Sequence, residues 1–486
     1  MATQSMTTPA TLHVPPALAE RLFDHLFPGD GDEHGAVIGA TAVETSRGTR
    51  FLARRLYLAE DGVDYVPGKR GYRMLTATFV RDRIKDCERE GLAYFAVHCH
   101  GGTDRVGFSG DDLASHERGY PALLDILEHY PVGGLVFARE AAAGDVWIQG
   151  GGRVELTSAT LHSEPTRVLR PAPTPVAMAD SAYDRQSRLF GDRGQAILAS
   201  QKVGIIGVGG AGSLINEYLA RLGVGHIVVV DPDRIEITNL PRVVGSRRRD
   251  ALPWLTKPGR PELVRKIGQK LATPKVNVAQ RVARQANPEI KFDAVRGDVT
   301  VDAIATSLID CDYLFLAADS MQARLVVNAL VHQYLISAVQ VGAKVQLDKV
   351  GDVIDVFSVV RPLTPGASCL WCNELIKPAK LQEEALTPEQ RQQQRYVDDA
   401  DVHAPSVISL NAVTAAHAVD SYLMLTVGLV PADYVERWTR FHPLASAASD
   451  RVIHEIPRSD ERCPECGVNG RLGFGTGRRL PVRASE

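Results

Sequence analysis

The stretch VGIIGVGGAGSLINEYLARLGVGHIVVVDPD, residues 203–233, decides the fold of the second half of the chain. An apolar, strand-like run leads into a glycine-rich loop, a helix-like segment and a second apolar run. Loop amides and a helix N-terminus bind phosphate groups. The glycines of this loop are Gly207, Gly209, Gly210 and Gly212. Asp231 lies 24 residues after Gly207, at the end of the next strand, where a carboxylate would reach a ribose hydroxyl. The stretch therefore predicts a nucleotide site.

Strand-like and helix-like segments continue to alternate through this half. The pattern runs through KVGIIGV, SLINEYLARLG, HIVVVD, PKVNVAQRVARQANP and DYLFLAAD. Such alternation is typical of βαβ units. We therefore expect an α/β protein with a mostly parallel sheet.

A second group of polar residues follows Asp231. The segment DPDRIEITNLPR, which begins at Asp231, places Asp233, Asn239 and Arg242 close together in sequence. A nicotinamide-dependent dehydrogenase would share the loop and Asp231, but has no evident need for this cluster. A carboxylate attacking the α-phosphate of ATP does need cations, because negative charge builds up on the phosphates. The cluster favours that chemistry over hydride transfer.

The first half carries a candidate catalytic metal site. GLAYFAVHCH, which ends at His100, predicts a buried strand. Side chains at i and i+2 of a strand face the same way, so His98 and His100 can converge on one ion. Asp112 can supply a third ligand, and a water the fourth. Glu33 can then take the proton of that water. This ligand set is typical of catalytic zinc.

The same residues also have a purely structural interpretation. Ser109 and Asp112 suit the first turn of a helix, with Ser109 as the N-cap and Asp112 at the third helical position. Histidine pairs on strands are often only packed or hydrogen-bonded. Spacing alone leaves both interpretations open.

Four cysteines predict a second metal site. CLWC contains Cys369 and Cys372, and CPEC contains Cys463 and Cys466. Two Cys-x-x-Cys pairs suit tetrahedral thiolate coordination of zinc, and a site closed by four protein ligands is structural. Such a site would hold the C-terminal part of the chain and leave 471–486 as a mobile tail.

Composition bounds the remaining choices. The 486 residues are 44% hydrophobic and 23% charged, as in ordinary globular proteins. The net charge of −3 gives no reason to expect a nucleic acid partner, and no apolar run suits a membrane helix, so no membrane partner is expected. With no signal-peptide pattern and seven cysteines, an odd number, the cytoplasm is the expected location.

A proline-rich segment in the sequence suggests two domains. Alternating prolines mark a linker, placed at 163–182, between a domain at 1–162 and a domain at 183–470. Two polar stretches, 246–274 and 378–403, are expected to be solvated surface loops.

A resemblance to the JAMM (MPN-plus) metalloproteases covers roughly residues 12–155. It rests on Glu33, His98, His100, Ser109 and Asp112. Members of that family cut isopeptide or peptide bonds at the C-terminus of ubiquitin-like proteins. The resemblance implies an α/β metalloprotease domain in which His98, His100 and Asp112 bind zinc. It also implies that Glu33 is the general base and that Ser109 hydrogen-bonds the oxyanion. Eight residues separate His100 from Ser109, where seven are usual.

A second resemblance covers about 183–470. AYDRQSRLFGDRGQAIL, which contains Arg185, resembles the opening motif of the ThiF/MoeB superfamily, the adenylating domains of ubiquitin-activating enzymes. This implies a domain with a Rossmann-like sheet whose enzyme activity uses ATP and Mg²⁺. Arg185 would be supplied to the neighbouring subunit, which implies a homodimer.

The same resemblance assigns residues to the nucleotide. Asp231 would bind the ribose, and Asn239, Arg242 and Lys275 would contact the phosphates. Asp319 would hold magnesium. One departure is Val243, where the family usually has glutamine.

The remaining cysteines bear on the step after adenylation. Cys87 and Cys99 lie in the first half, and Cys311 precedes a strand expected to be buried. We therefore expect adenylation without a thioester on this chain. The combined hypothesis is that the first half trims a ubiquitin-like or sulfur-carrier protein and the second half adenylates the exposed carboxylate. The alternatives are adenylation of a peptide or small acid, and a first half that acts separately or only as a docking module.

Overall fold

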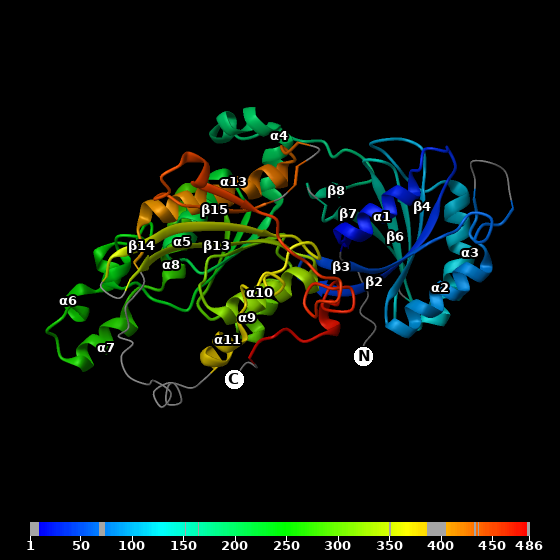
Figure 1. Ribbon diagram of the computed structural model, residues 1–486. Helices are drawn as coiled ribbons and strands as arrows, with labels where there is room; N and C mark the ends of the chain where they lie inside the picture. The colour runs from blue at the N-terminus through cyan, green and yellow to red at the C-terminus, as the bar shows by residue number, and fades with distance from the viewer. Residues whose placement is uncertain are drawn as a thin grey trace. The chain divides into compact units, whose positions relative to one another are not determined.

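The computed structural model describes residues 9–67, 73–150, 152–163, 165–348, 351–385, 405–431, 434–435 and 437–483. It divides into two compact units. The first comprises the chain up to Pro175 with His332–Leu335 and Cys466–Arg479, and the second comprises the rest (Figure 1).

An eight-stranded sheet forms the first unit, in the order β1-β3-β2-β4-β5-β6-β7-β8. β1 also pairs with β7, so the sheet closes on itself. The strands are β1 (Ala10–Val14), β2 (Gly35–Thr45), β3 (Gly48–Leu58), β4 (Ala93–Cys99), β5 (Val132–Phe137), β6 (Ala142–Ile148), β7 (Gly152–Leu161) and β8 (Arg167–Leu169). The expected strand before His100 is β4.

Three helices cover this sheet: α1 (Pro16–Leu26), α2 (Ala77–Glu90) and α3 (Gly110–Leu127). Because side chains alternate along β4, Phe95 packs in the core that contains Leu22 of α1, whereas Tyr94 packs with Ile84 of α2. The strand that ends at the two histidines is therefore buried on both faces.

A pair of buried histidines lies between β1 and the end of β7. Nδ1 of His13 is 3.1 Å from Nε2 of His162, and both rings are buried. Burial, reinforced by the positive charge of Arg50, lowers the pKa of both residues, that of His162 to about 3. Both rings are therefore neutral in the folded protein at neutral pH.

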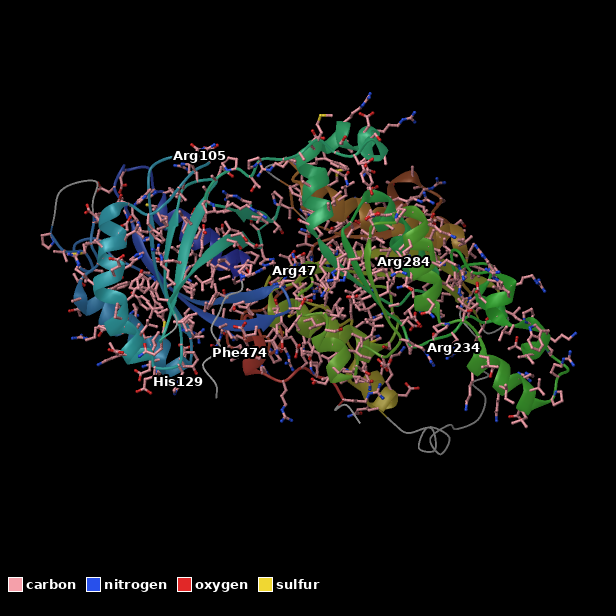
Figure 2. All side chains as sticks on the ribbon, turned by 180° about the vertical axis from the view of Figure 1, so that it is seen from behind. Arg47, Arg105, His129, Arg234, Arg284 and Phe474 are labelled. Atoms are coloured by element: carbon pink, nitrogen blue, oxygen red, sulfur yellow. The ribbon has the colours of Figure 1, made fainter. Side chains whose placement is uncertain are left out.

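This pair predicts acid sensitivity. A histidine of the unfolded chain binds a proton below about pH 6.5, whereas His162 stays neutral down to about 3. The stability that comes from keeping this histidine neutral is therefore fully present above pH 6.5 and is lost as the pH falls toward 3. His162 alone is expected to cost about 2 kcal/mol of unfolding free energy near pH 5, measured by urea titration. His162→Leu should reduce the pH dependence by the share of His162, whereas His129→Gln, at an exposed position labelled in Figure 2, should leave it unchanged.

The second unit is built on another eight-stranded sheet, in the order β11-β10-β9-β12-β13-β14-β15-β16. Pairing is parallel from β11 to β13 and antiparallel beyond. The strands are β9 (Lys202–Ile206), β10 (His226–Val230), β11 (Lys291–Val295), β12 (Tyr313–Leu316), β13 (Ser337–Leu347), β14 (Val353–Leu363), β15 (Trp438–Phe441) and β16 (Val452–Glu455). The mixed α/β class is confirmed, with a larger antiparallel part than expected.

Helices α5, α8 and α13 supply apolar side chains to the core of this sheet. The α-helices described after residue 183 are α4 (Asp184–Ser200), α5 (Gly210–Leu222), α6 (Pro253–Thr256), α7 (Glu262–Leu271), α8 (Lys275–Ala286), α9 (Asp302–Thr306), α10 (Met321–Tyr334), α11 (Pro378–Ala385) and α13 (Ile408–Val427). None of the helices in the described part of the chain is long and apolar enough to cross a membrane. The expected surface loop at 246–274 instead contains α6 and α7. Of the other expected loop, 378–385 is helical and 386–403 lies outside the described residues.

Two boundary predictions differ from the structure. Part of the expected linker, Arg167–Leu169, is strand β8 and pairs with β7. The expected mobile tail is hydrogen-bonded where it is described: Arg483 Nη2 lies 2.7 Å from Asp298 Oδ2, and the Arg54 guanidinium lies 3.5 Å from the Phe474 ring centroid. Polar and aromatic side chains thus hold a segment that composition alone predicts to be loose.

Candidate functional site

The glycine loop lies between β9 and α5, at the carboxyl end of the parallel strands. Gly207 has φ +88°, and a Cβ there would lie 3.0 Å from the backbone of Ala317 and Ala318. A Cβ on Gly212 would lie 1.9 Å from the carbonyl oxygen of Gly207, so α5 begins against the loop. A Cβ on Gly209 would meet nothing within 4 Å, which leaves space beside its backbone.

These surroundings predict a large loss of stability for one alanine substitution and a small change for another. Gly212→Ala forces Cβ into the Gly207 backbone and is expected to cost about 2–4 kcal/mol of unfolding free energy. Gly209→Ala, the matched control, has open space and should change stability by less than about 1 kcal/mol. Thermal unfolding of both variants checks this, and equal Tm values would contradict the close packing.

Asp231 ties the loop to the end of β10. Its side chain is buried, Oδ2 accepts the Val208 N–H at 2.8 Å, and Oδ1 accepts the Asp233 N–H at 2.8 Å. Burial raises the pKa of this carboxyl, an effect that Lys275 opposes. The carboxylate predicted for the ribose thus also holds the loop in shape.

Lys275 lies beside the same loop. It is the first residue of α8, and its Nζ lies 2.7 Å from Oδ2 of Asp233. Its backbone N–H donates to the Asp233 carbonyl at 3.0 Å. The structure therefore brings together Asp231, Asp233 and Lys275, although the long insertion of 246–274 separates the last from the others in sequence.

The other nucleotide-site candidates have different surroundings. Asn239 is buried, and its Oδ1 accepts the Glu236 N–H at 3.2 Å. Arg242 is half-buried, with Nη1 3.4 Å from the Thr238 carbonyl oxygen. Asp319 is exposed after β12, and Arg185 is exposed on α4.

Two neighbours of this edge were not singled out from the sequence. Buried Asn411 of α13 lies over the loop, since a Cβ on Gly210 would come within 2.2 Å of its Nδ2. Glu384 of α11 caps α10, accepting the N–H groups of Met321 at 2.8 Å and Gln322 at 2.9 Å. No sequence signal marked Asn411, because α13 also carries other polar residues such as Thr414, His417 and Asp420.

The first unit brings the predicted metal ligands together. The ligand atoms of His98, His100 and Asp112 all lie within 4.8 Å of one another. The two Nε2 atoms are 3.1 Å apart, and they lie 3.5 and 3.4 Å from the Asp112 carboxylate. Oε1 of Glu33 lies 3.8 Å from Nε2 of His100. One carboxylate and two imidazoles facing one point are a suitable donor set for zinc.

The pKa values of the residues in this cluster are shifted in different directions. Burial would raise the pKa of Asp112, but hydrogen bonds from His100 and His98 hold it far below its usual range. The hydrogen bond to Asp112 raises the pKa of His100. Burial raises the pKa of Glu33, which makes its carboxylate a stronger proton acceptor.

Ser109 takes the structural role that its spacing allowed. Its hydroxyl accepts the Asp112 N–H at 3.1 Å, and its own N–H donates to Asp112 Oδ2 at 2.7 Å. The Ser109 hydroxyl also donates to that oxygen at 2.7 Å. The capping box and the ligand cluster therefore coexist, and the Ser109 proton points at Asp112.

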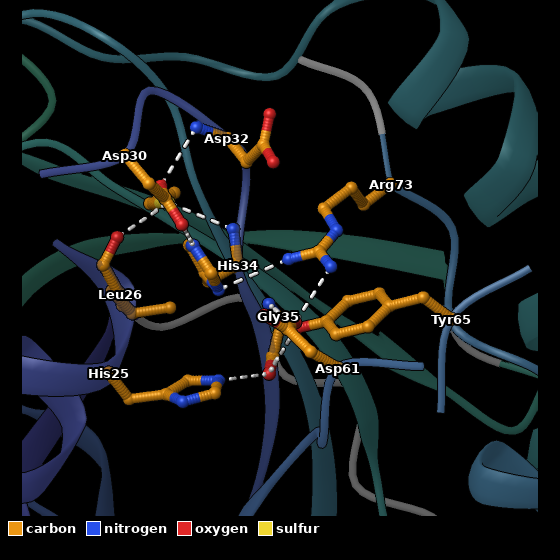
Figure 3. A network of polar contacts seen from close by, with 10 residues as sticks. His25, Leu26, Asp30, Asp32, His34, Gly35, Asp61, Tyr65 and Arg73 are labelled. Atoms are coloured by element: carbon orange, nitrogen blue, oxygen red, sulfur yellow. Dashed lines mark hydrogen bonds and ion pairs between the residues drawn. The ribbon is translucent and has the colours of Figure 1, made fainter. Parts of the chain in front are cut away.

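A polar network surrounds the residue after Glu33 (Figure 3). His34 Nε2 lies 3.0 Å from Asp30 Oδ2, and its backbone N–H donates to the Cys99 sulfur at 3.2 Å. Arg73 Nη1 lies 3.4 Å from His34 Nδ1, and its Nη2 pairs with Asp61 at 2.7 Å. The network joins the start of β2 to the strand of the histidines. Sequence reasoning missed it because Arg73 and Cys99 lie 39 and 65 residues from His34 in the chain.

The four predicted cysteines also meet. The sulfur atoms of Cys369, Cys372, Cys463 and Cys466 lie within 4.8 Å of one another. Three of the four residues are buried. Four thiolates in this arrangement suit a structural zinc ion.

The other three cysteines, all in the described part of the chain, are buried. Burial raises the pKa of Cys87 to about 12 and raises that of Cys99. Cys311 has no exposed surface. A thiolate is therefore disfavoured at Cys87 and Cys99, and Cys311 is shielded from solvent.

A glycine loop that joins a strand to a helix at the carboxyl end of parallel strands is the arrangement of α/β nucleotide-binding folds. The model of the ThiF family matches residues 183–465, more than half of the chain. The chain therefore belongs to the ThiF family.

Individual relatives match shorter stretches. The chain is 30% identical over 150 residues to the SAMP-activating enzyme E1 of Haloferax volcanii, covering 30% of this chain and 48% of the relative. It is 29% identical over 136 residues to the sulfur carrier protein ThiS adenylyltransferase of Escherichia coli, covering 28% and 46%. The chain spans about half the length of these curated relatives. Among solved structures, E. coli MccB with ATP is 19% identical with a TM-score of 0.42, covering 60% of this chain and 75% of that one.

Proposed function

We propose that the second unit adenylates the C-terminal carboxylate of a ubiquitin-like or sulfur-carrier protein. The observation that carries the proposal is the convergence of Asp231, Asp233 and Lys275 beside the glycine loop. Membership of the ThiF family and the names of the relatives support it.

The reaction places charge where these residues lie. A carboxylate oxygen of the carrier attacks the α-phosphorus of ATP, the bond to the bridging oxygen breaks, and pyrophosphate leaves. Lys275 and Arg242 offset the charge on the phosphates, and Asn239 donates to them. Asp231 accepts from the ribose, and Asp319 would hold the Mg²⁺ that shields the leaving pyrophosphate.

The fate of the adenylate depends on the cysteines. Because Cys87, Cys99 and Cys311 are buried, the acyl group passes to an external nucleophile rather than to a thiol of this chain. The exposed position of Arg185 supports its supply to a neighbouring subunit in a homodimer.

The first unit is proposed to trim the same carrier as a zinc-dependent peptidase. His98, His100 and Asp112 would hold the ion, which lowers the pKa of a bound water to about 7 when present. Glu33 takes a proton from the attacking water and returns it to the leaving amine. The Ser109 hydroxyl must turn from Asp112 to donate to the oxyanion. Trimming and activation on one chain raise the effective concentration of the new C-terminus.

Capture with an inactive peptidase tests both parts. The Glu33→Ala variant, expressed in the native host, should retain a small protein that ends in Gly-Gly plus further residues, identified by mass spectrometry. Wild-type protein should cut that extension, and the trimmed carrier should then support ATP–pyrophosphate exchange. Cutting without exchange would reject adenylation of that carrier, and exchange with a small acid alone would favour the alternative substrate class. Zinc analysis should give two ions per chain in the wild type, and one would reject the peptidase.

A further inference from the structure

The insertion before Lys275 is a folded element of the second unit, and residues 246–271 are termed the basic arm. It contains α6 and α7 after a 3₁₀ turn at Arg248–Ala251. Asp250 fastens its base: the buried carboxylate pairs with Arg281 of α8 at 2.8 Å, and its carbonyl accepts the Thr273 N–H at 2.9 Å. Gly268 is buried where α7 packs on α6. The arm is therefore fastened to α8 at its base, and its two helices pack on each other.

One face of α7 presents an apolar stripe. Leu263, Ile267 and Leu271 are spaced by four residues, so they share a face of the helix. They are 71%, 47% and 64% exposed, and Trp254 of α6 is 61% exposed. Exposed apolar side chains are common singly, but a row of this kind along one short helix marks a binding surface.

The arm is strongly basic. Its only acidic residues are Asp250, which is buried, and Glu262, which pairs with Lys266 at 2.7 Å. The cationic side chains are all exposed: Arg247, Arg248, Arg249, Lys257, Arg260, Arg265, Lys266 and Lys270. Helical spacing places Lys266 and Lys270 along one side of the apolar stripe, and the arm carries an excess of positive charge whereas the whole chain has a net charge of −3.

We propose that the basic arm binds the surface of a membrane that contains anionic phospholipid. A short helix with an apolar face bordered by lysine and arginine lies in the plane of such a surface, with its apolar side chains among the acyl chains. Lys266 and Lys270 can extend to the headgroups beside the stripe, and Trp254 suits the interface. This contact requires no membrane-spanning helix.

Other occupants fit the arm less well. A nucleic acid would match the cations but offers nothing to Leu263, Ile267 and Leu271. A stable protein interface buries about 800 Å² on each partner, more than one face of a ten-residue helix supplies. A lipid surface needs neither a complementary shape nor a large area, because charge adds to the apolar contact.

Cosedimentation of the full-length protein with vesicles tests the proposal. Binding is expected to phosphatidylcholine vesicles that contain phosphatidylglycerol, and not to phosphatidylcholine alone. Each cation near an anionic surface contributes about a factor of five in affinity, so Lys266→Glu/Lys270→Glu should bind at least about tenfold more weakly. Leu263→Ser/Ile267→Ser/Leu271→Ser should also lose binding.

A control variant distinguishes binding by the arm from a general effect of the protein's charge. Arg284→Glu/Lys291→Glu makes the same charge change at exposed positions outside the arm (Arg284 is labelled in Figure 2) and should bind as the wild type does. Absence of binding to anionic vesicles at low ionic strength overturns the proposal, as does an equal loss in this control. If the triple serine variant instead dissociates an oligomer in lipid-free gel filtration, a second copy covers the stripe and the proposal is wrong. Membrane binding by the arm does not depend on adenylation by the second unit.

Discussion

Replacing Lys275 with alanine is expected to lower ATP–pyrophosphate exchange by about 10²–10³, the usual cost of removing one group that stabilises transition-state charge. Lys275 contacts Asp233 at 2.7 Å and opposes the raised pKa of Asp231. The Asp233 side chain is 62% exposed, so their ion pair contributes at most about 1 kcal/mol to stability. The variant should therefore fold normally and fail at the phosphates.

Lys291→Ala is the matched control, since it removes an exposed lysine of the same unit from β11. Its exchange rate should equal that of the wild type. A Lys275→Ala variant with exchange within about threefold of the wild type would show that Lys275 only begins α8 and pairs with Asp233.

Replacing Cys463 with serine is expected to remove one zinc ion per chain and to lower the Tm by about 10 °C. Structural zinc contributes folding free energy directly, so losing one of four thiolates should cost more than about 3 kcal/mol of unfolding free energy. In a domain of this size each kcal/mol lowers the Tm by about 2–4 °C, which gives the expected change. Metal analysis and calorimetry of the purified variant measure both quantities.

Cys311→Ser distinguishes the site from a general cysteine effect. Cys311 is buried in the core, so its variant can lose stability but should keep its full zinc content. A chelator should lower the Tm of the wild type toward that of Cys463→Ser and leave the variant nearly unchanged. Equal zinc content in Cys463→Ser and wild-type protein would reject the four-cysteine site.

The apolar periodicity in the sequence correctly predicted the parts of the fold that local physics controls. The runs ending at Ile206, Val230 and Leu316 became β9, β10 and β12, because apolar runs of this short length, rich in β-branched residues and bounded by turns, favour strands buried in a sheet. The i, i+2 spacing of His98 and His100 likewise gave their convergence, since strand geometry requires it.

Surface elements were harder to predict from the sequence. The stretch 246–274 was expected to be a loop because of its charge, yet α7 forms there by packing Gly268 against α6. The tail was expected to be mobile, yet Arg483 pairs with Asp298, a partner 185 residues earlier in the chain. Such contacts depend on distant residues, which composition does not reveal.

The sequence by itself determined the chemistry that is available: a glycine loop, a carboxylate after the next strand, two histidines on one strand face and two Cys-x-x-Cys pairs. These features depend on local spacing, because the geometry of a strand or helix fixes which side chains point to the same face. Only the tertiary structure decided which distant groups meet, such as Lys275 with Asp233 and His34 with Arg73. It also decided that Ser109 serves Asp112 in a capping box and that the stripe on α7 stays exposed. Pairing across the chain and exposure depend on how whole elements pack, and no local pattern contains that information.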